Sequence, residues 1–138
     1  FVIDRHRDDF IKLIDEGLID ILFSNEAEIC ALARVQDCEA AIARFASKLP
    51  TLIVTRGEHG AIAIQGGERH EVAAAPVDRV IDTTGAGDLF AAGFLAGYVR
   101  GKDAATCLEI GAIAAAEVIS HYGARPEADL KALAADLI

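Results

Sequence analysis

The chain has 138 residues, 53% of them hydrophobic, and its formal net charge is −9 at pH 7. This length predicts a single domain over residues 1–138 with a real core, and the apolar content excludes a disordered chain. The negative charge argues against nucleic acid and anionic membranes as partners, because phosphate-rich surfaces require a basic face. No apolar run approaches the ~18 residues of a membrane span, and early charges predict no signal peptide.

Cysteine and histidine usage indicates neither a disulfide framework nor a metal centre. The cysteines Cys30, Cys38 and Cys107 are odd in number and lack CxxC spacing. We therefore expect free thiols and a cytoplasmic location. The four histidines are scattered along the chain without metal-ligand spacing.

Polar caps and boundary residues delimit three predicted helices in the first part of the chain. Gly17 is placed to end the first helix. Ser24 or Asn25 can cap the second helix, Asp37 can cap the third, and Pro50 stops it. A short apolar run between the first two helices predicts a buried strand. The first helix is predicted to end at residue 17, the second to span 26–33 and the third to span 37–48. The strand is predicted over residues 19–23.

The middle of the chain predicts a strand, a turn and a hairpin. Residues 51–55 are β-branched and apolar, as in a strand, and a glycine-containing turn follows over 56–60. Residues 61–65 form a second predicted strand. Gly66-Gly67 favours a tight turn into a third strand over 69–73.

The stretch from Val80 to Phe94 predicts a strand, a tight turn and a helix in succession. Val80 and Ile81 are β-branched and suit the end of a strand. Gly85 and Gly87 remove side chains where the next helix begins. The free amides and partial positive charge of a helix N-terminus favour a bound phosphate.

Asp88 lies in the first turn of this predicted helix, which runs to about Tyr98. A carboxylate beside a phosphate site repels the anion, so its presence suggests a general base that takes a proton from an attacking hydroxyl. The alternative is structural: Asp88 complements the helix dipole, and Gly85 and Gly87 only make a turn. The stretch alone leaves both interpretations open.

The last part of the chain predicts two more helices. Asp103 is placed to cap a long alanine-rich helix that runs to about Ser120, and Gly123 is a candidate C-cap. Pro126 is placed to open a final helix with leucines at helical spacing. The alternation of helices and strands predicts an α/β domain in which helices cover a sheet.

Three segments in order carry a resemblance to a known family. Residues 25–28 match an N-x-x-E element, residues 54–61 a T-x-G-x-x-G turn, and residues 82–88 a D-T-x-G-A-G-D signature. The chain thereby resembles the ribokinase-like (PfkB) family of sugar and nucleoside kinases over essentially its whole length. Within the family it looks most like the bacterial adenosine kinase-like branch. The resemblance implies a three-layer α/β/α sandwich, present here as its C-terminal, nucleotide-binding half.

The resemblance also implies an ATP-dependent kinase that phosphorylates an alcohol group of a sugar or nucleoside. Asp88 would be the base that deprotonates the acceptor hydroxyl. The backbone of Gly85, Ala86 and Gly87 would form the anion hole for the transferring phosphoryl group. A positioned base of this kind is typically worth ~10²–10⁴ in rate.

Two metal sites are implied in the same way. Glu28 would help to hold Mg²⁺ through water, with Asn25 near the phosphates. Asp82 resembles a residue beside which many members of the family hold a monovalent cation, such as K⁺.

The nucleotide site is implied at four further positions. Thr55, Gly57 and Gly60 would border the nucleotide. Ala112 stands where sugar-binding members often carry an asparagine that lines the adenine site. The adenine contacts of those members therefore cannot be transferred to this position.

Members of the family are much longer than this chain. Their N-terminal half, which holds the first strands, the acceptor site and a small β-lid, has no counterpart here. We expect the chain either to pair with a missing N-terminal half or to associate with itself, because an open sheet edge is adhesive. Alone, the 138 residues are expected to be inactive.

Two alternative functions compete with the kinase interpretation. A dinucleotide-binding oxidoreductase is disfavoured, because Phe90 stands where the G-x-G-x-x-G motif needs a small residue. A non-catalytic nucleotide-binding or assembly module, which keeps the half-fold without an acceptor site, stays open.

Overall fold

The computed structural model describes residues 2–138, and Phe1 lies outside the described part. The chain forms two compact units. The first comprises the described residues through Arg56 together with Ile62–Arg69. The second comprises Gly57–Ala61 and His70–Ile138. That residues 1–138 act as one domain stays a prediction.

Four strands form one sheet in the order β1-β2-β3-β4, so that β1 and β4 lie at its edges. β1 and β2 are parallel, with Asn25 opposite Thr55 at their carboxyl ends. The side chains of β1 are only partly buried, in contrast to the buried strand that was predicted, since an edge strand has a neighbour on one side only. The strands are β1 (Ile21–Asn25), β2 (Thr51–Thr55), β3 (Ala61–Gln65) and β4 (Glu68–Val72).

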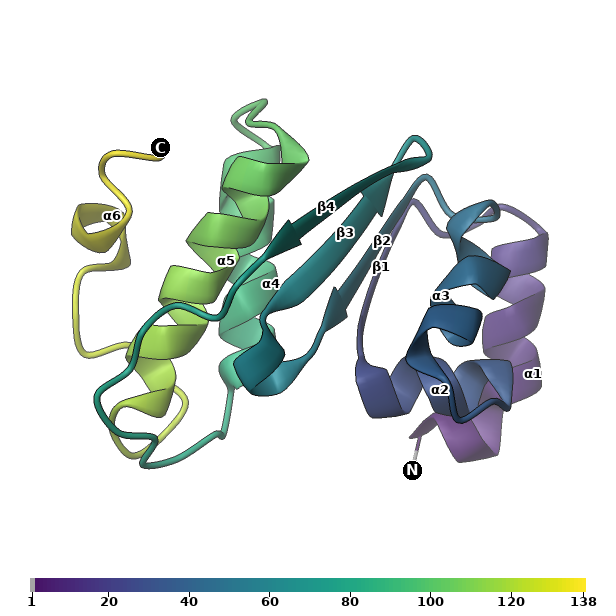
Figure 1. Ribbon diagram of the computed structural model, residues 1–138, viewed down its shortest axis with the longest axis horizontal. Coiled ribbons are helices and arrows are strands. Elements are labelled where there is room, and N and C mark those ends of the chain that lie inside the picture. The colour runs from purple at the N-terminus through teal and green to yellow at the C-terminus, as the bar shows by residue number, and fades with distance from the viewer. Residues whose placement is uncertain (1) are drawn as a thin grey trace. The chain divides into compact units, whose positions relative to one another are not determined.

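Three helices of the first unit pack together beside β1 and β2 (Figure 1). Their caps agree with the sequence predictions. Asn25 caps α2 through the amide of Glu28, and Asp37 caps α3 through the amide of Ala40. Gly17 follows α1 with a φ of 67°, which a glycine adopts without strain. The helices are α1 (Val2–Asp15), α2 (Glu26–Ala33) and α3 (Cys38–Ala46).

The core of this unit lies between these helices and the sheet. Its members are apolar side chains that lose essentially all contact with water, and their burial is the main stabilising contribution to this unit. The largest of its fully buried side chains are Ile29, Ile42, Phe45, Leu52, Val54 and Ile62. This core fixes the ends of β1 and β2, where two predicted site residues lie.

The second unit is built on a pair of long helices, α4 (Ala86–Tyr98) and α5 (Ala104–Ile119), that lie side by side (Figure 1). Glycines allow their backbones to approach closely. A Cβ atom on Gly93 would lie 2.7 Å from the Ile110 carbonyl oxygen, and one on Gly111 would lie 2.9 Å from the Phe90 carbonyl oxygen. Asp103 caps α5 as predicted, and α5 packs against the short helix α6 (Leu130–Leu133). The 3₁₀ turn η1 (Gly57–His59) also belongs to this unit.

Three local predictions in the second unit are wrong. Val80 and Ile81 do not form a strand. The Ile81 amide instead donates to the Ile119 carbonyl, because none of the described strands lies alongside to form a ladder. Gly123 is not the C-cap of α5, because the helix ends at Ile119 and Ser120 is its C-cap. Pro126 does not open the last helix, which Asp129 caps.

None of the helices in residues 2–138 has both the length and the apolar content that a membrane crossing requires. The three cysteines are free thiols, as predicted.

The close approach of α4 and α5 predicts that Gly93→Ala destabilises the protein. The added methyl group must push the Ile110 backbone away, which should cost about 1–3 kcal/mol of unfolding free energy. Urea unfolding measures this difference. Gly87→Ala is the matched control in the same helix, since a Cβ there meets nothing within 4 Å. Equal effects of the two substitutions would contradict the packing argument.

Candidate functional site

The first unit brings three predicted site residues together where β1 and β2 end. Asn25 and Glu28 form a reciprocal capping box: the Asn25 amide donates to Glu28 Oε2 at 2.9 Å, and the Glu28 amide donates to Asn25 Oδ1 at 2.8 Å. Thr55 stands opposite Asn25 in the strand register, and its hydroxyl donates to the Ser24 carbonyl at 3.4 Å. Both Asn25 and Glu28 are exposed, so the helix cap and a ligand could share them.

The second unit holds the two glycines of the predicted nucleotide turn. Gly57 and Gly60 have φ values of 56° and 83°, in the left-handed region that favours glycine. A Cβ on Gly60 would collide with the Val72 carbonyl oxygen, whereas one on Gly57 would meet nothing within 4 Å. Gly60 is therefore required by packing, and Gly57 only by backbone conformation.

Asp82 anchors the loop in front of α4. Its Oδ1 atom accepts from the Thr84 hydroxyl at 2.6 Å and from the Thr84 amide at 2.9 Å, and its Oδ2 atom accepts from the Gly123 amide at 3.0 Å. These bonds, that of the Thr84 hydroxyl first and that of the Gly123 amide next, lower the pKa of Asp82 to about 2. The ionised carboxylate therefore joins the D-T-x-G-A-G-D segment to the loop that follows α5.

The N-terminus of α4 presents backbone amides without a side-chain cap. Gly85 occupies the N-cap position with a φ of 82°. The Ala86 amide donates to the Thr83 carbonyl at 3.2 Å, whereas the amides of Gly85, Gly87 and Asp88 have no hydrogen-bond partner in residues 2–138. A helix of thirteen residues with open N-terminal amides provides the partial positive charge that an anion needs.

The Asp88 side chain stands in the first turn of α4 and is exposed. It makes no hydrogen bond or ion pair with the described residues. Since it accepts nothing from the N-terminal amides, it does not act as a cap for this helix. The structural interpretation then retains only the weaker role of complementing the helix dipole.

The loop after α5 contains a group that the sequence did not reveal. Glu117, on the last turns of α5, accepts through Oε1 from the amides of Glu127 and Ala128, both at 2.8 Å, and faces His121 Nε2 at 3.2 Å. Burial acts to raise the pKa of Glu117, but the two amides and His121 outweigh it and lower the pKa. The bond to the Tyr122 carbonyl, followed by that to Glu117, raises the pKa of His121. A glutamate near the end of an alanine-rich helix gives no local signal of these contacts.

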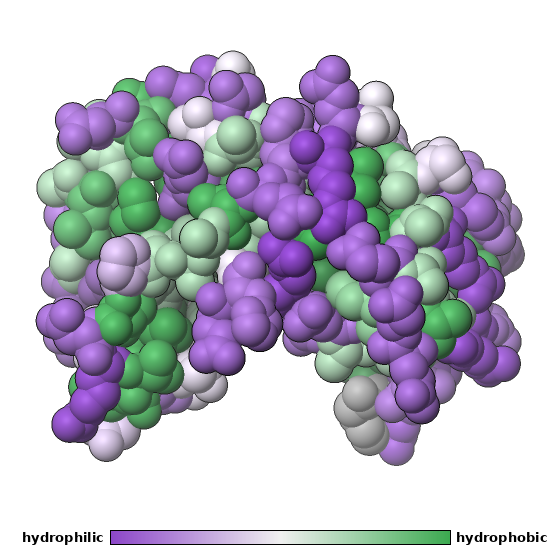
Figure 2. Space-filling model, viewed as in Figure 1, coloured by the Kyte–Doolittle hydropathy of each residue, from purple (hydrophilic) through white to green (hydrophobic). Residues whose placement is uncertain are grey.

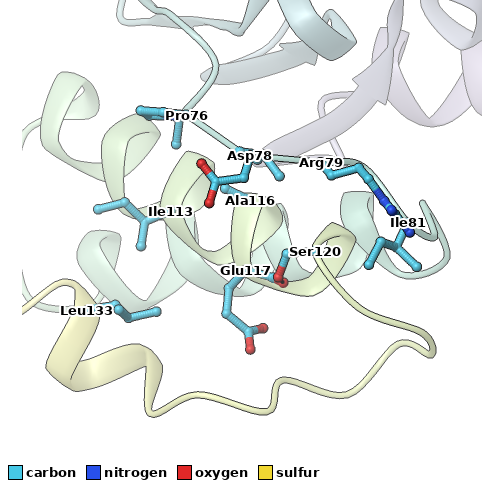
Figure 3. A pocket seen from close by; sticks show the side chains of 11 residues that line it. Pro76, Asp78, Arg79, Ile81, Ile113, Ala116, Glu117, Ser120 and Leu133 are labelled. Carbon is cyan, nitrogen blue, oxygen red and sulfur yellow. Dashed lines mark hydrogen bonds between the residues drawn. The ribbon is translucent and has the colours of Figure 1, made fainter.

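A hollow of about 530 Å³ opens beside α5 in the second unit, and apolar surface is visible over α5 and α6 in Figure 2. Ile81, Ile113 and Leu133 contribute apolar side chains to it, and Figure 3 shows them around α5. Its size lies in the range of small-ligand sites. Ala112 is not among the lining residues and is only 8% exposed, so the structure gives it no contact with this hollow.

No group of three or more His, Cys, Asp or Glu side chains within residues 2–138 is arranged to hold a metal ion. This excludes a cage built from the described residues, but Mg²⁺ commonly keeps several waters and takes one or two carboxylates together with substrate phosphates. Glu28 fits that pattern, because it is exposed and only its Oε2 atom is engaged.

Comparison with known proteins identifies the family of this chain. The pfkB family of carbohydrate kinases matches residues 2–130, so the chain belongs to this family. The cytidine kinase of Thermococcus kodakarensis is 34% identical over 128 residues, which cover 86% of this chain and 45% of that enzyme.

Solved structures agree with this membership. The adenosine kinase of Sinorhizobium meliloti matches with a TM-score of 0.94 and 38% identity, over 99% of this chain and 42% of its own. An E. coli protein designated ribokinase II, in complex with ATP and Mg²⁺, matches with a TM-score of 0.82 and 28% identity, over 98% of this chain and 43% of its own. The fold is thus part of the ribokinase-like α/β fold, and the chain spans less than half the length of these relatives.

The Asp82 anchor predicts a pH-dependent contribution to stability. Because the folded-state pKa of about 2 lies below the ordinary value of 3.8, the contribution is complete above about pH 4 and is lost as the pH falls through about 2. Asp82→Asn should lower the free energy of unfolding at neutral pH, since an amide nitrogen cannot accept from Gly123. The difference from wild type should shrink between pH 4 and pH 2.

Urea unfolding at several pH values measures this difference. Asp78→Asn is the control, because Asp78 is exposed and has no hydrogen bond with the described residues. A difference for Asp82→Asn that stays constant down to pH 2 would show that the carboxylate charge is not involved.

Proposed function

We propose that this chain is the nucleotide-side part of an ATP-dependent kinase that phosphorylates an alcohol group of a sugar or a nucleoside. The observation that carries the proposal is the start of α4, where uncapped amides and an exposed, unpaired carboxylate occur within four residues. The amides suit an anion, and the carboxylate suits a proton acceptor. Membership of the pfkB family, with its nucleoside- and sugar-kinase relatives, supports the same reaction.

In the proposed mechanism, Asp88 accepts the proton of the acceptor hydroxyl as its oxygen attacks the γ-phosphorus of ATP. The bond between that phosphorus and the β–γ bridging oxygen breaks, and ADP leaves. The amides of the Gly85–Gly87 turn donate hydrogen bonds to the phosphoryl oxygens as charge develops on them. Phosphoryl transfer depends mainly on positioning and on charge stabilisation, so amides and one base are sufficient protein chemistry.

Glu28 is the proposed Mg²⁺ residue, acting through retained water. When bound, the ion neutralises charge on the nucleotide phosphates. Its exposed carboxylate and its place beside Asn25, at the end of β1, support the assignment. We assign Asn25 to the phosphates for the same reason.

Four residues are proposed to border the nucleotide: Thr55, Gly57, Gly60 and, on α5, Ala112. The first three support the assignment through a strand end and a glycine turn, where backbone can approach a ligand closely. Ala112 has no side-chain polar group and offers only its small size. Asp82 is proposed to lie beside a monovalent cation such as K⁺, and its ionised state supports this assignment.

The remaining part of the site is proposed to come from an N-terminal half. The chain covers 42–45% of the relatives compared above, and β1 lies at an edge of the sheet. A strand from that half would complete the backbone pairing of β1. We propose a cytoplasmic location, in keeping with the free thiols.

The principal prediction concerns Asp88 in the parent protein, meaning this chain together with its N-terminal half. Asp88→Asn should lower kcat at least about 100-fold while ATP still binds, because it removes the base and leaves the amides in place. ATP- and Mg²⁺-dependent phosphorylation of adenosine, ribose and fructose would be measured, along with ATP affinity by calorimetry. Asp136→Asn, an exposed position without described contacts, is the matched control.

An unchanged rate for Asp88→Asn would remove the base from the mechanism. A wild-type protein that binds ATP but phosphorylates none of the acceptors, with or without the N-terminal half, would favour a non-catalytic nucleotide-binding or assembly module. The small share of each relative that the chain spans keeps that second function in view.

Glu28→Gln separates the metal role of Glu28 from its helix-capping role. Glutamine can serve as the third residue of a capping box, so unfolding free energy should change by less than about 0.5 kcal/mol. The Mg²⁺ concentration for half-maximal activity should rise, because the anionic oxygens are lost. Glu26→Gln, in the same helical turn, is the control. An unchanged Mg²⁺ requirement would leave Glu28 with the capping role alone.

A further inference from the structure

The loop that follows α5 contacts the proposed anion site at two points. The Gly123 amide donates to the Asp82 carboxylate. Ala124 packs against Gly85, since a Cβ on Gly85 would lie only 2.7 Å from the Ala124 Cβ. Gly85, the N-cap of α4, is therefore held between the Asp82 loop and residues 123–124. Any group that fixes this second segment also fixes the open amides of α4.

Glu117 provides the attachment on the other side of Ala124. Its Oε1 atom accepts hydrogen bonds from the amides of Glu127 and Ala128, which lie three and four residues after Ala124. His121 lies on the near side, 3.2 Å from the same oxygen. One carboxylate oxygen thus holds both ends of the segment 121–128. Figure 3 shows the Glu117 side chain directed from α5 toward this C-terminal segment.

The environment of Glu117 makes these bonds stronger than ordinary surface contacts. The side chain is 8% exposed, and its Oε2 atom is buried without a hydrogen bond to the described residues. A buried carboxylate with one unsatisfied oxygen is costly, so the chain tolerates it only where the other bonds compensate. Hydrogen bonds to an ionised acceptor are roughly twice as strong as neutral ones.

Residues at the C-terminal end of α5 therefore hold both segments that flank the proposed anion site. The Ile119 carbonyl accepts from the amides of Ile81 and Asp82, at 2.8 and 3.4 Å, and so holds the segment that leads to Gly85. Glu117 holds the segment that carries Gly123 and Ala124. These two segments contact each other at Asp82 and at Gly85.

We propose that Glu117 is a positioning residue for phosphoryl transfer: it fixes the segment 121–128, and through it the N-terminal turn of α4. This inference rests on the proposed kinase function for its catalytic consequence. In the proposed mechanism, Glu117 touches neither the substrate nor the reacting atoms. Its effect on the reaction runs through Gly123 and Ala124.

The experiment uses the parent protein and two substitutions of Glu117. Glu117→Ala removes all three bonds and should lower kcat about 10-fold or more, with the KM of the alcohol acceptor unchanged, because only the phosphoryl side is displaced. Glu117→Gln keeps one acceptor oxygen for the two amides, so it should restore kcat to within about threefold of wild type. Glu109→Ala, at an exposed position of the same helix, is the matched control.

Hydrogen exchange supplies a readout that does not require activity. In Glu117→Ala, the amides of Gly123, Glu127 and Ala128 should lose protection, while amides in the core strand β2 keep theirs. Retained protection at all three amides would overturn the positioning role, even in a protein that proves not to be a kinase. Lost protection with an undiminished kcat would overturn the link to catalysis and leave the proposed function standing. If Glu117→Ala loses protection globally, the test turns to Glu117→Gln. Faster exchange at the three amides with an intact core would then support the role, because a neutral oxygen is the weaker acceptor, and exchange equal to wild type would overturn it.

Discussion

The hydrogen bond from the Gly123 amide to the Asp82 carboxylate is the constraint on which the second unit depends. It joins two segments that lie 41 residues apart in the sequence, one before α4 and one after α5. A single ionised side chain can do this because each oxygen serves a different segment: Oδ1 orders Thr84 locally, and Oδ2 reaches Gly123. The low pKa of Asp82 is the energetic counterpart of this geometry, since each donor favours the charged form.

The glycines around this bond act through what they exclude. Gly93 and Gly111 let α4 and α5 meet backbone to backbone, and Gly85 leaves room for Ala124 at the helix start. The position of the α4 amides is thus set by close packing along the helix and by loop contacts at its end. Side-chain caps are absent there, and this absence leaves the amides available to an external anion.

Local signals in the sequence were sufficient for most elements. Asn25, Asp37 and Asp103 cap the helices that they were predicted to cap, and Gly66-Gly67 turns the hairpin, because caps and turns depend on a few neighbouring residues.

The predictions that failed concern residues whose partners are distant in the sequence. Val80 and Ile81 have strand-like side chains, but a strand requires a ladder partner, and none of the strands in residues 2–138 lies alongside them. Gly123 looks like a helix terminator and instead serves Asp82, and Glu117 looks like an ordinary helical acid. The resemblance supplied the proposed roles of the site residues, which spacing alone left open.

The proposed phosphate site lies on an acidic chain, so it needs a source of positive potential other than basic side chains. With a net charge of −9, the long-range field of this chain opposes an incoming nucleotide. The start of α4 contains Asp88 and no basic residue, so within this helical turn the chain's own attraction for an anion comes from backbone dipoles. Such dipoles act over short distances and only when they are fixed in place, because a mobile loop would spend part of its time pointing them elsewhere. This requirement explains why so many contacts converge on one helical turn: the Asp82 carboxylate, the Ala124 contact and the Glu117 attachment all reduce the freedom of the segments around Gly85. In the proposed reaction, an exposed carboxylate can then stand beside the phosphoryl group, since the rigid amides offset the repulsion that Asp88 introduces.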